Sequence, residues 1–414
     1  MYTRSFMMGI ILCVQPLYVH AESLQESMHM AAKQHPMLQM AEQNITAAKG
    51  NLMEQGAYAY NPELLIEPQR RRLNGGGATN DYYLTFSQGI EMGGKQALRE
   101  RSAKAMLHVA QQHKKVTRQQ LSIQAAKAYV TRYFANRLLK MRQQQRDMLM
   151  VVKLAVVQKM AVGQSNQLAV NLAQSALASA LNATTLAKQN LMRSQKAYAL
   201  ALGQKNIVTD LSRLQLPELY IDWKTPEHAY QIALASRPDL LALQAQGKVS
   251  DAQVALADAA RISDLTLSAK VAREAGDQLL SVAITVPFAL WNNHTGAYRA
   301  SLANQERMDT RVIWAKQQLR YDVENAIENH RNAMQSLSDI RIYQMQQSAN
   351  DTIRLAQQAY DAGELDLEEW VVHIRQALDA QITTLDIIKQ AWFSRILLAQ
   401  VLGHPEYILQ GIQS

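Results

Sequence analysis

Apolar and polar residues alternate most clearly between Tyr82 and Ile90. Apolar side chains occupy every second position there, small or polar residues lie between them, and Gln88 is the one exception. A period of two predicts a strand with one apolar and one polar face. Gly93-Gly94 follows, and from Lys95 the chain lacks proline for more than a hundred residues. We therefore expect a very long helix directly after the strand.

Three further stretches alternate in the same way, so the predicted strands are about 62–70, 81–90, 263–272 and 279–288. A strand of about nine or ten residues is long enough to cross a bilayer when it is tilted. The alternative is a four-stranded sheet packed on helices in a soluble protein. No neighbouring segment is apolar enough to cover such a face, and we therefore favour strands that lie in a membrane.

The two halves of the chain resemble each other. At an offset of 200 residues, Gly163 and Gly203 align with Gly363 and Gly403, and His35-Pro36 pairs with Arg237-Pro238 at nearly the same offset. We interpret the similarity as a tandem duplication. The predicted parts are a first repeat at 22–203, a linker at 204–224 and a second repeat at 225–414.

Each half is predicted to contain a first helix, two strands, a very long helix, a turn and a return helix. The first helices are expected at about 24–57 and 226–260, and the very long helices at about 95–161 and 296–361. The turn contains Gly163 or Gly363. The return helix ends at Gly203 or Gly403, the position that a helix C-cap favours.

The four strands cannot close a barrel alone, and open sheet edges are not tolerated in lipid. The missing strands must come from other copies, and a trimer would supply twelve, enough for a barrel with a lumen. A helix of about 65 residues is roughly 100 Å long, and its thin apolar seam suits side-by-side packing around water. The predicted fold is mainly α with a small β part: duplicated long-helix hairpins and four transmembrane strands, with a trimer forming a 12-stranded β-barrel on an α-barrel.

Composition and the N-terminus narrow the class of protein. The 414 residues are 48% hydrophobic and 19% charged, and mean hydropathy is −0.22, which is too low for a helical membrane protein. A secretory signal peptide is predicted at residues 1–21 from Arg4, an apolar run over Phe6–Val14 and the small residue Ala21. The alternative is a buried first helix.

The single cysteine, Cys13, lies inside the predicted signal peptide. After cleavage, the chain would therefore have no thiolate that could bind a metal. A net charge of +8 spread over such a chain argues against nucleic-acid binding.

The order of these elements resembles the TolC-type outer-membrane efflux proteins over essentially the whole mature chain. Residues Ile90–Lys95 (IEMGGK) and Val286–Asn292 (VPFALWN) are similar to two motifs of the cobalt-zinc-cadmium branch, close to PLELGGKR and PLPLWNRN. Gly89 and Gln96 depart from the proline and arginine that this branch usually has. The strand-to-helix turns would then contain Gly93, Gly94, Lys95, Pro287 and Asn292.

The resemblance implies an outer-membrane exit duct of a tripartite RND-type efflux system in a Gram-negative bacterium, with a long periplasmic extension. Its partners would be two further copies of the chain, a periplasmic membrane-fusion adaptor, an inner-membrane RND pump and outer-membrane lipid. The branch suggests heavy-metal cations as cargo. The alternatives are a general TolC-like drug or protein export duct and, from another class, a soluble periplasmic helical scaffold or adaptor.

The two turns differ in charge, which makes them candidate functional positions. The second turn holds five carboxylates that the first lacks: Asp361, Glu364, Asp366, Glu368 and Glu369. Repeated in a trimer, they would form a ring that attracts cations. Alternatively, acids simply favour the first turn of a helix. The resemblance implies that the adaptor docks at this tip, around Gly163 and Gly363.

Other motifs carry little chemistry. The glycines before Lys95 lack the spacing of a phosphate-binding loop. Methionines and histidines between Met28 and Met40 could bind copper(I), but methionine more often fills helix packing. No catalytic constellation, resident metal site or cofactor site stands out, so we expect no enzyme. Arg70-Arg71-Arg72 precedes a glycine-rich loop and is interpreted either as a solvated basic segment or as a partner of lipid phosphates.

Overall fold

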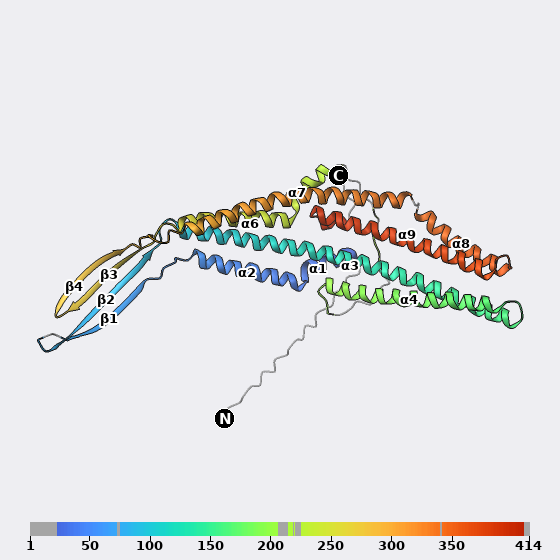
Figure 1. Cartoon of the computed structure of the whole chain (residues 1–414), viewed down its shortest axis with the longest axis horizontal. Coiled ribbons are helices and arrows are strands. Elements are labelled where there is room, and N and C mark those ends of the chain that lie inside the picture. Colours follow the sequence, from blue (N-terminus) through green and yellow to red (C-terminus); the bar gives the residue numbers. More distant parts are fainter. Residues whose placement is uncertain are drawn as a thin grey trace, which may run out of the picture.

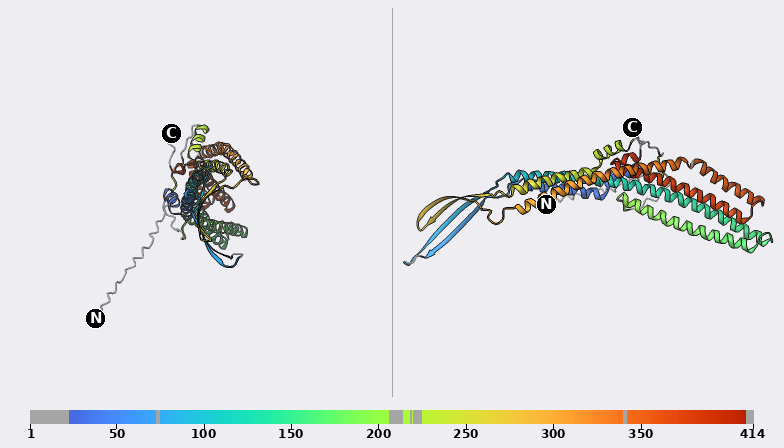
Figure 2. Two further views of the ribbon diagram at one scale, coloured as in Figure 1. Left: turned by 90° about the vertical axis from the view of Figure 1, so that its left-hand side faces the viewer. Right: turned by 45° about the horizontal axis from the view of Figure 1, so that its top comes forward.

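A computed structural model describes residues 23–72, 75–205, 214–217, 219, 225–339 and 342–409. Long helices and one small antiparallel sheet form an elongated molecule, with the sheet at one end and two helical turns at the other (Figure 1). The right-hand view in Figure 2 shows the same separation of the two ends. The predicted mainly helical class with a small sheet is confirmed. The predicted signal peptide and most of the predicted linker lie outside the described residues.

The helices follow the same order in both halves. In the first half they are α1 (Leu24–Gln34), α2 (Pro36–Gly56), α3 (Lys95–Ala161) and α4 (Gln167–Ala201). In the second half they are α5 (Pro226–Ser236), α6 (Pro238–Ala259), α7 (Thr295–Asp339), α8 (Ile342–Ala362) and α9 (Leu367–Leu402), followed by the short 3-10 helix η1 (Pro405–Ile408). The helix predicted over 296–361 thus corresponds to α7 and α8, on either side of two residues that are not described.

The prediction of one continuous helix at 24–57 and another at 226–260 was wrong. Each is two helices, because Pro36 and Pro238 start a new helix. The residue before a proline avoids the helical region, and His35 and Arg237 accordingly have extended backbones, with ψ of 137° and 112°.

Each proline break contacts the end of the return helix of its own half. Gly203 and Gly403 have φ of 68° and 80°, a left-handed conformation that favours glycine. A Cβ atom on Gly203 would lie 2.6 Å from Cδ of Pro36, and one on Gly403 would lie 3.0 Å from the backbone nitrogen of Arg237. The close approach explains why a glycine occurs at this place in both halves.

The sheet has the order β1 (Glu63–Arg72), β2 (Ala78–Ile90), β3 (Leu265–Glu274) and β4 (Asp277–Thr285), and every neighbouring pair is antiparallel. Its central pairing, β2 with β3, joins the two halves of the chain. The strand predicted at 279–288 ends three residues early, before Pro287, which has no N–H to donate to a ladder.

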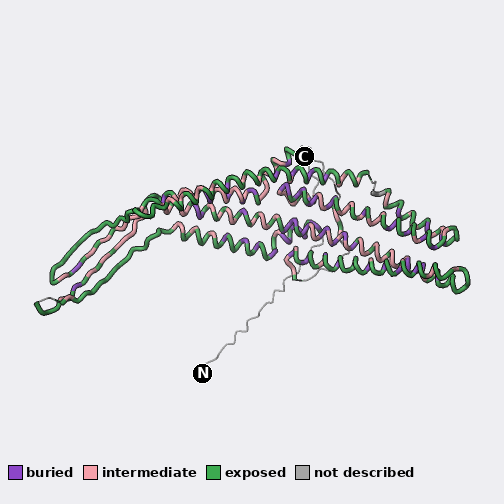
Figure 3. The backbone as a smooth tube through the Cα atoms, viewed as in Figure 1, coloured by how far each residue is buried: buried purple, intermediate pink, exposed green. Residues whose placement is uncertain are grey.

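One face of the sheet is apolar, as the alternation predicts. This face, called the apolar face below, carries the even-numbered residues of β1, β2 and β4 and the odd-numbered residues of β3. Ile66, Leu280 and Val282 on it are 67%, 77% and 70% exposed. Within the described residues, therefore, no helix covers the sheet; Figure 3 shows strands that are largely exposed and burial concentrated along the middle of the helices.

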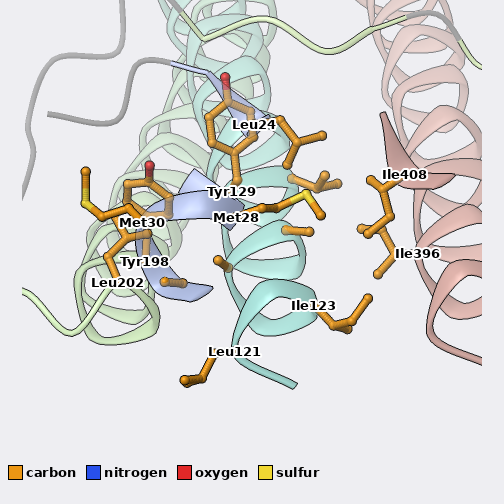
Figure 4. Close-up of a cluster of buried hydrophobic side chains, with 14 of the residues drawn as sticks. Leu24, Met28, Met30, Leu121, Ile123, Tyr129, Tyr198, Leu202, Ile396 and Ile408 are labelled. Carbon is orange, nitrogen blue, oxygen red and sulfur yellow. The ribbon is translucent and has the colours of Figure 1, made fainter. Parts of the chain in front are cut away.

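The largest core lies where α1, α3, α4 and α9 meet (Figure 4). Tyr129 and Tyr198 are fully buried there, with ring centroids 6.1 Å apart. The hydroxyl groups of Tyr198 and Ser27 are 2.6 Å apart, and the Arg132 guanidinium lies 4.8 Å from the Tyr198 ring centroid. A second core, called the hairpin core below, joins the α3–α4 and α8–α9 hairpins near the turns.

His330 is a buried titratable group between α7 and α9. Its side chain is 3% exposed, and Nδ1 lies 2.9 Å from Oγ of Ser394. Burial, together with the nearby positive charge of Arg395, lowers the pKa of His330 from 6.5 to about 4. The folded protein therefore holds this imidazole neutral under conditions in which the unfolded chain would protonate it.

Acid should destabilise the protein through His330. Because the folded-state pKa is depressed, the unfolded state binds more protons as pH falls from about 6.5 to about 4. Between pH 7 and 5 we expect a loss of about 2 kcal/mol from this group. Chemical denaturation of wild type and His330→Leu at both pH values measures it. The variant should lose less stability than wild type on acidification, and an equal loss would contradict the assignment.

Candidate functional site

The turn from β2 into α3 is built by two glycines. Gly93 and Gly94 have φ of 71° and 67°, which L side chains rarely adopt. A Cβ on Gly93 would also lie 3.1 Å from Cδ1 of Ile262. The turn aims Lys95, the first residue of α3, at the segment that leads into β3.

Asp264 is the centre of this junction, and no motif in the sequence had pointed to it. Nζ of Lys95 donates to Oδ1 of Asp264 at 2.8 Å and to the carbonyl of Ile262 at 2.7 Å. The Tyr60 hydroxyl donates to Oδ2 of Asp264 at 2.7 Å, and the backbone N–H of Met92 donates to Oδ1 at 2.8 Å. The carboxylate thus ties the second half of the chain to both sides of the first half's strand pair.

The hydrogen bonds favour the charged form of Asp264. Partial burial by itself raises the pKa of this carboxyl, but the bonds from Lys95, Tyr60 and Met92 outweigh burial and hold the pKa below its ordinary value. The same contact raises the pKa of Tyr60, since its hydroxyl donates to a carboxylate. The junction is therefore an ion pair with supporting neutral donors.

The connection from β4 to α7 differs from the first junction. It contains Pro287 and Asn292, and Oδ1 of Asn292 accepts from the backbone N–H of His294 at 3.1 Å. Three large apolar side chains of this connection point outward: Phe288, Leu290 and Trp291 are 82%, 77% and 96% exposed. A run of exposed apolar residues at the end of a strand is typical of a surface that meets lipid or another chain.

The two glycine turns lie together at the end opposite the sheet (Figure 1). Gly163 and Gly363 have φ of 79° and 78°. Backbone N–H groups close each helix end, from Gln164 to the carbonyl of Lys159 and from Glu364 to the carbonyl of Ala359, both at 2.8 Å. A Cβ on either glycine would meet no atom within 4 Å, so both turns face open space.

The five carboxylates of the second turn are all exposed, but they do not all have the same surroundings. Asp366 and Glu369 form a capping box at the start of α9, with bonds of 2.8 and 3.1 Å between side chain and backbone. Asp361 accepts from Nε2 of Gln357 at 3.0 Å. Helix capping therefore accounts for two of the acids, and Glu364 and Glu368 are the better candidates for contact with a solute.

The hairpin core connects the two turns. Trp370 is fully buried and Tyr360 nearly so, with ring centroids 5.7 Å apart. Nζ of Lys159, from the first hairpin, lies 4.6 Å from the centroid of the Tyr360 ring on the second. These contacts hold the two turns of one chain next to each other.

Charged residues also meet at the loop end of the sheet, on its polar face. Nε of Arg71 lies 3.2 Å from Oδ2 of Asp81, and Arg71 also pairs with Glu274. Asp81 is fully buried and accepts from the backbone N–H of Ala275 at 2.9 Å. Of the three consecutive arginines in the sequence, the middle one is therefore part of a link between β1, β2 and β3.

The two methionines of α1 lie in a hydrophobic core. Met28 and Met30 are buried in the largest core, and Figure 4 shows them among leucine and tyrosine side chains. Nδ1 of His35 accepts from the backbone N–H of Met37 at 3.2 Å. In the described residues there is no group of three or more histidine, cysteine, aspartate or glutamate side chains placed to hold a metal ion. Each described helix is too short or too polar to cross a membrane.

Comparisons with known proteins agree with this architecture. The family model for outer membrane efflux proteins matches residues 229–404, which lie in the second half of the chain. A search of curated proteins finds no significant match.

Solved outer-membrane channels share the fold. The structure of CusC is similar with a TM-score of 0.74 at 17% identity, over 94% of this chain and 96% of that one. The outer-membrane channel OprN gives 0.77 at 16% identity, over 92% and 89%. The open-state MtrE outer-membrane channel of Neisseria gonorrhoeae gives 0.75 at 16% identity, over 94% and 91%. At these identities, the structures show that this chain has the fold of those channels.

Loss of the Asp264 carboxylate should weaken the junction. Asp264→Asn removes the charge that Lys95 faces, and both side chains of the pair are mostly buried, at 21% and 13% exposed. We expect a cost of about 2 kcal/mol in free energy of unfolding. Asp258→Asn is the matched control, because its pair with Arg261 is exposed and such pairs contribute less than about 1 kcal/mol. Equal stability of the two variants would contradict a central role for Asp264.

Proposed function

We propose that this chain is the outer-membrane exit duct of a tripartite efflux system. The observation that carries the proposal is the sheet: four strands with an exposed apolar face and two open edges, continued at one end by long helices. The family match in the second half and the fold shared with outer-membrane channels support it. A soluble scaffold or adaptor would leave so large an apolar face in water.

The duct is formed by three copies of the chain. Strands β1 and β4 each have an unpaired edge, and lipid cannot satisfy the backbone groups there. If β4 of one copy pairs with β1 of the next, three copies close a barrel of twelve strands. The helices of the three copies would continue the barrel as a long periplasmic tube around water.

The energy for transport comes from partners. The described residues offer a passive wall and two turns at the far end of the helices, so an inner-membrane RND-type pump would drive export through a periplasmic adaptor. We propose that the adaptor docks around Gly163 and Gly363. The open space around both glycines and the difference in charge between the two turns support that place.

Heavy-metal cations are the proposed cargo. The proposal depends on the similarity of Ile90–Lys95 and Val286–Asn292 to the cobalt-zinc-cadmium motifs and on the exposed acids of the second turn. Three copies of Glu364 and Glu368 would lower the local potential at the periplasmic entrance. A general drug or protein export duct of the same fold is the second candidate.

The location and size of the assembled protein test the duct. After extraction of membranes in mild detergent, we expect the chain in the outer-membrane fraction as a particle of three copies. The reason is that a single copy leaves both sheet edges unpaired. Membrane fractionation and light scattering with detergent correction measure both quantities. A soluble periplasmic monomer or dimer would refute the proposal.

Growth in metal salts tests the cargo. A strain that lacks this chain should grow poorly in zinc, cobalt or cadmium, and wild type should restore growth. Glu364→Gln/Glu368→Gln should restore it only partly, because the entrance would attract cations less strongly.

The matched control is Glu306→Gln/Glu328→Gln, which removes two exposed carboxylates from α7 and should restore growth fully. A strain that is sensitive to drugs but not to metals would favour the general export duct. Full restoration of growth by Glu364→Gln/Glu368→Gln would show that these acids do not contribute to export and only stabilise the start of the helix.

A further inference from the structure

The three consecutive arginines of β1 lie on different faces of the sheet. Side chains alternate along a strand, so Arg70 and Arg72 lie on the apolar face and Arg71 on the polar one. The register brings a third arginine to the apolar face: Tyr82 pairs with Pro68 on one side and with Arg273 on the other. Arg273 therefore lies one row closer to the helices than Arg70.

The apolar face has no acid that could neutralise these arginines. Every carboxylate of the four strands lies on the polar face: Glu63, Glu67, Asp81, Glu274 and Asp277. Arg71 uses two of them, Asp81 and Glu274. Arg70, Arg72 and Arg273 are exposed, and the ion pairs found within the described residues include none of the three. Their positive charges are therefore available to a negatively charged ligand outside the chain.

The depth of these arginines matches the edge of a membrane. Asn80, which pairs with Arg70, precedes Ile90 by ten residues on β2, or ~33 Å along the strand at ~3.3 Å per residue. A tilt of about 40° reduces this to ~25 Å along the membrane normal, about the height of the apolar band of outer-membrane barrels. Exposed Trp291 lies near the helix end of the sheet, where an aromatic girdle is expected.

The spacing of the arginines suits a ligand with more than one phosphate. Arg70 and Arg273 are two strands and two residues apart, which places their Cα atoms about 12 Å from each other. Long guanidinium side chains can approach one headgroup from that separation. Arginine binds phosphate through two parallel hydrogen bonds, and basic residues at the membrane surface attract anionic lipid.

We propose that Arg70, Arg72 and Arg273 bind the phosphate groups of a phosphorylated lipid in the outer leaflet, on the side of the sheet's loops. The inference rests on the proposed function, since it requires the apolar face to lie in the outer membrane. It assigns the consecutive arginines two roles: the middle one holds the strands together, and its neighbours, with Arg273, hold lipid.

Lipid titration of the purified full-length mature protein tests the inference. The probe is bis-phosphorylated lipid A added to protein in neutral detergent, with bound lipid counted by native mass spectrometry. Arg70→Gln/Arg72→Gln/Arg273→Gln should bind at least tenfold more weakly than wild type, at about fivefold per charge for independent contacts. Binding of a zwitterionic lipid should not change, and inorganic phosphate at the same concentration should not compete.

The matched control is Arg299→Gln/Arg307→Gln/Arg311→Gln, which removes three exposed arginines from α7 and should bind lipid A as wild type does. If the triple strand variant does not assemble, the single variants are titrated, and each should bind about fivefold more weakly. Wild-type affinity in the strand variants, or an equal loss in the control, would overturn the inference. Neither result would affect the proposal that the chain is an exit duct. That proposal fails if the chain is absent from the outer membrane.

Discussion

The unpaired edges of the sheet are the constraint on which the rest of the structure depends. A strand edge in water can bind solvent, but one in lipid must find another strand. Because β1 and β4 are both open, a single copy has no stable place in a membrane. In the proposed trimer the helices would be constrained as well, since α3 and α7 follow the strand pairs along the chain and would have to match the curvature of a closed barrel.

Two kinds of contact hold a single copy in shape before any assembly. At the sheet, Asp264 connects the halves through hydrogen bonds to side chains and backbone of the first half. At mid-length, each return helix ends against the proline break of its own half. The first contact is a polar pairing between halves, and the second is close packing that only glycine permits. Together they fix where the strands begin and where the long hairpins start.

Much of this fold could be predicted from the order of residues, and the missing part has a physical cause. Helix α3 has the predicted bounds because glycines in left-handed conformations flank it. The breaks at Pro36 and Pro238 were missed because proline is compatible with a helix start and the apolar pattern continues past it. Asp264 and Arg273 acquire their neighbours only through the pairing of β2 with β3. A single sequence does not reveal that pairing, so neither the junction nor the arginine group was predictable.

The pairing of β2 with β3 also limits how early the complete sheet can form. Ile90 and Leu265 are neighbours in space, although the α3–α4 hairpin, the linker, α5 and α6 separate them in sequence. Contacts with such large sequence separation form slowly. Until β3 is available, the edge of β2 that pairs with it remains open. An open strand edge can pair with another chain, so the folding intermediate with only the first strand pair is the one most prone to aggregation.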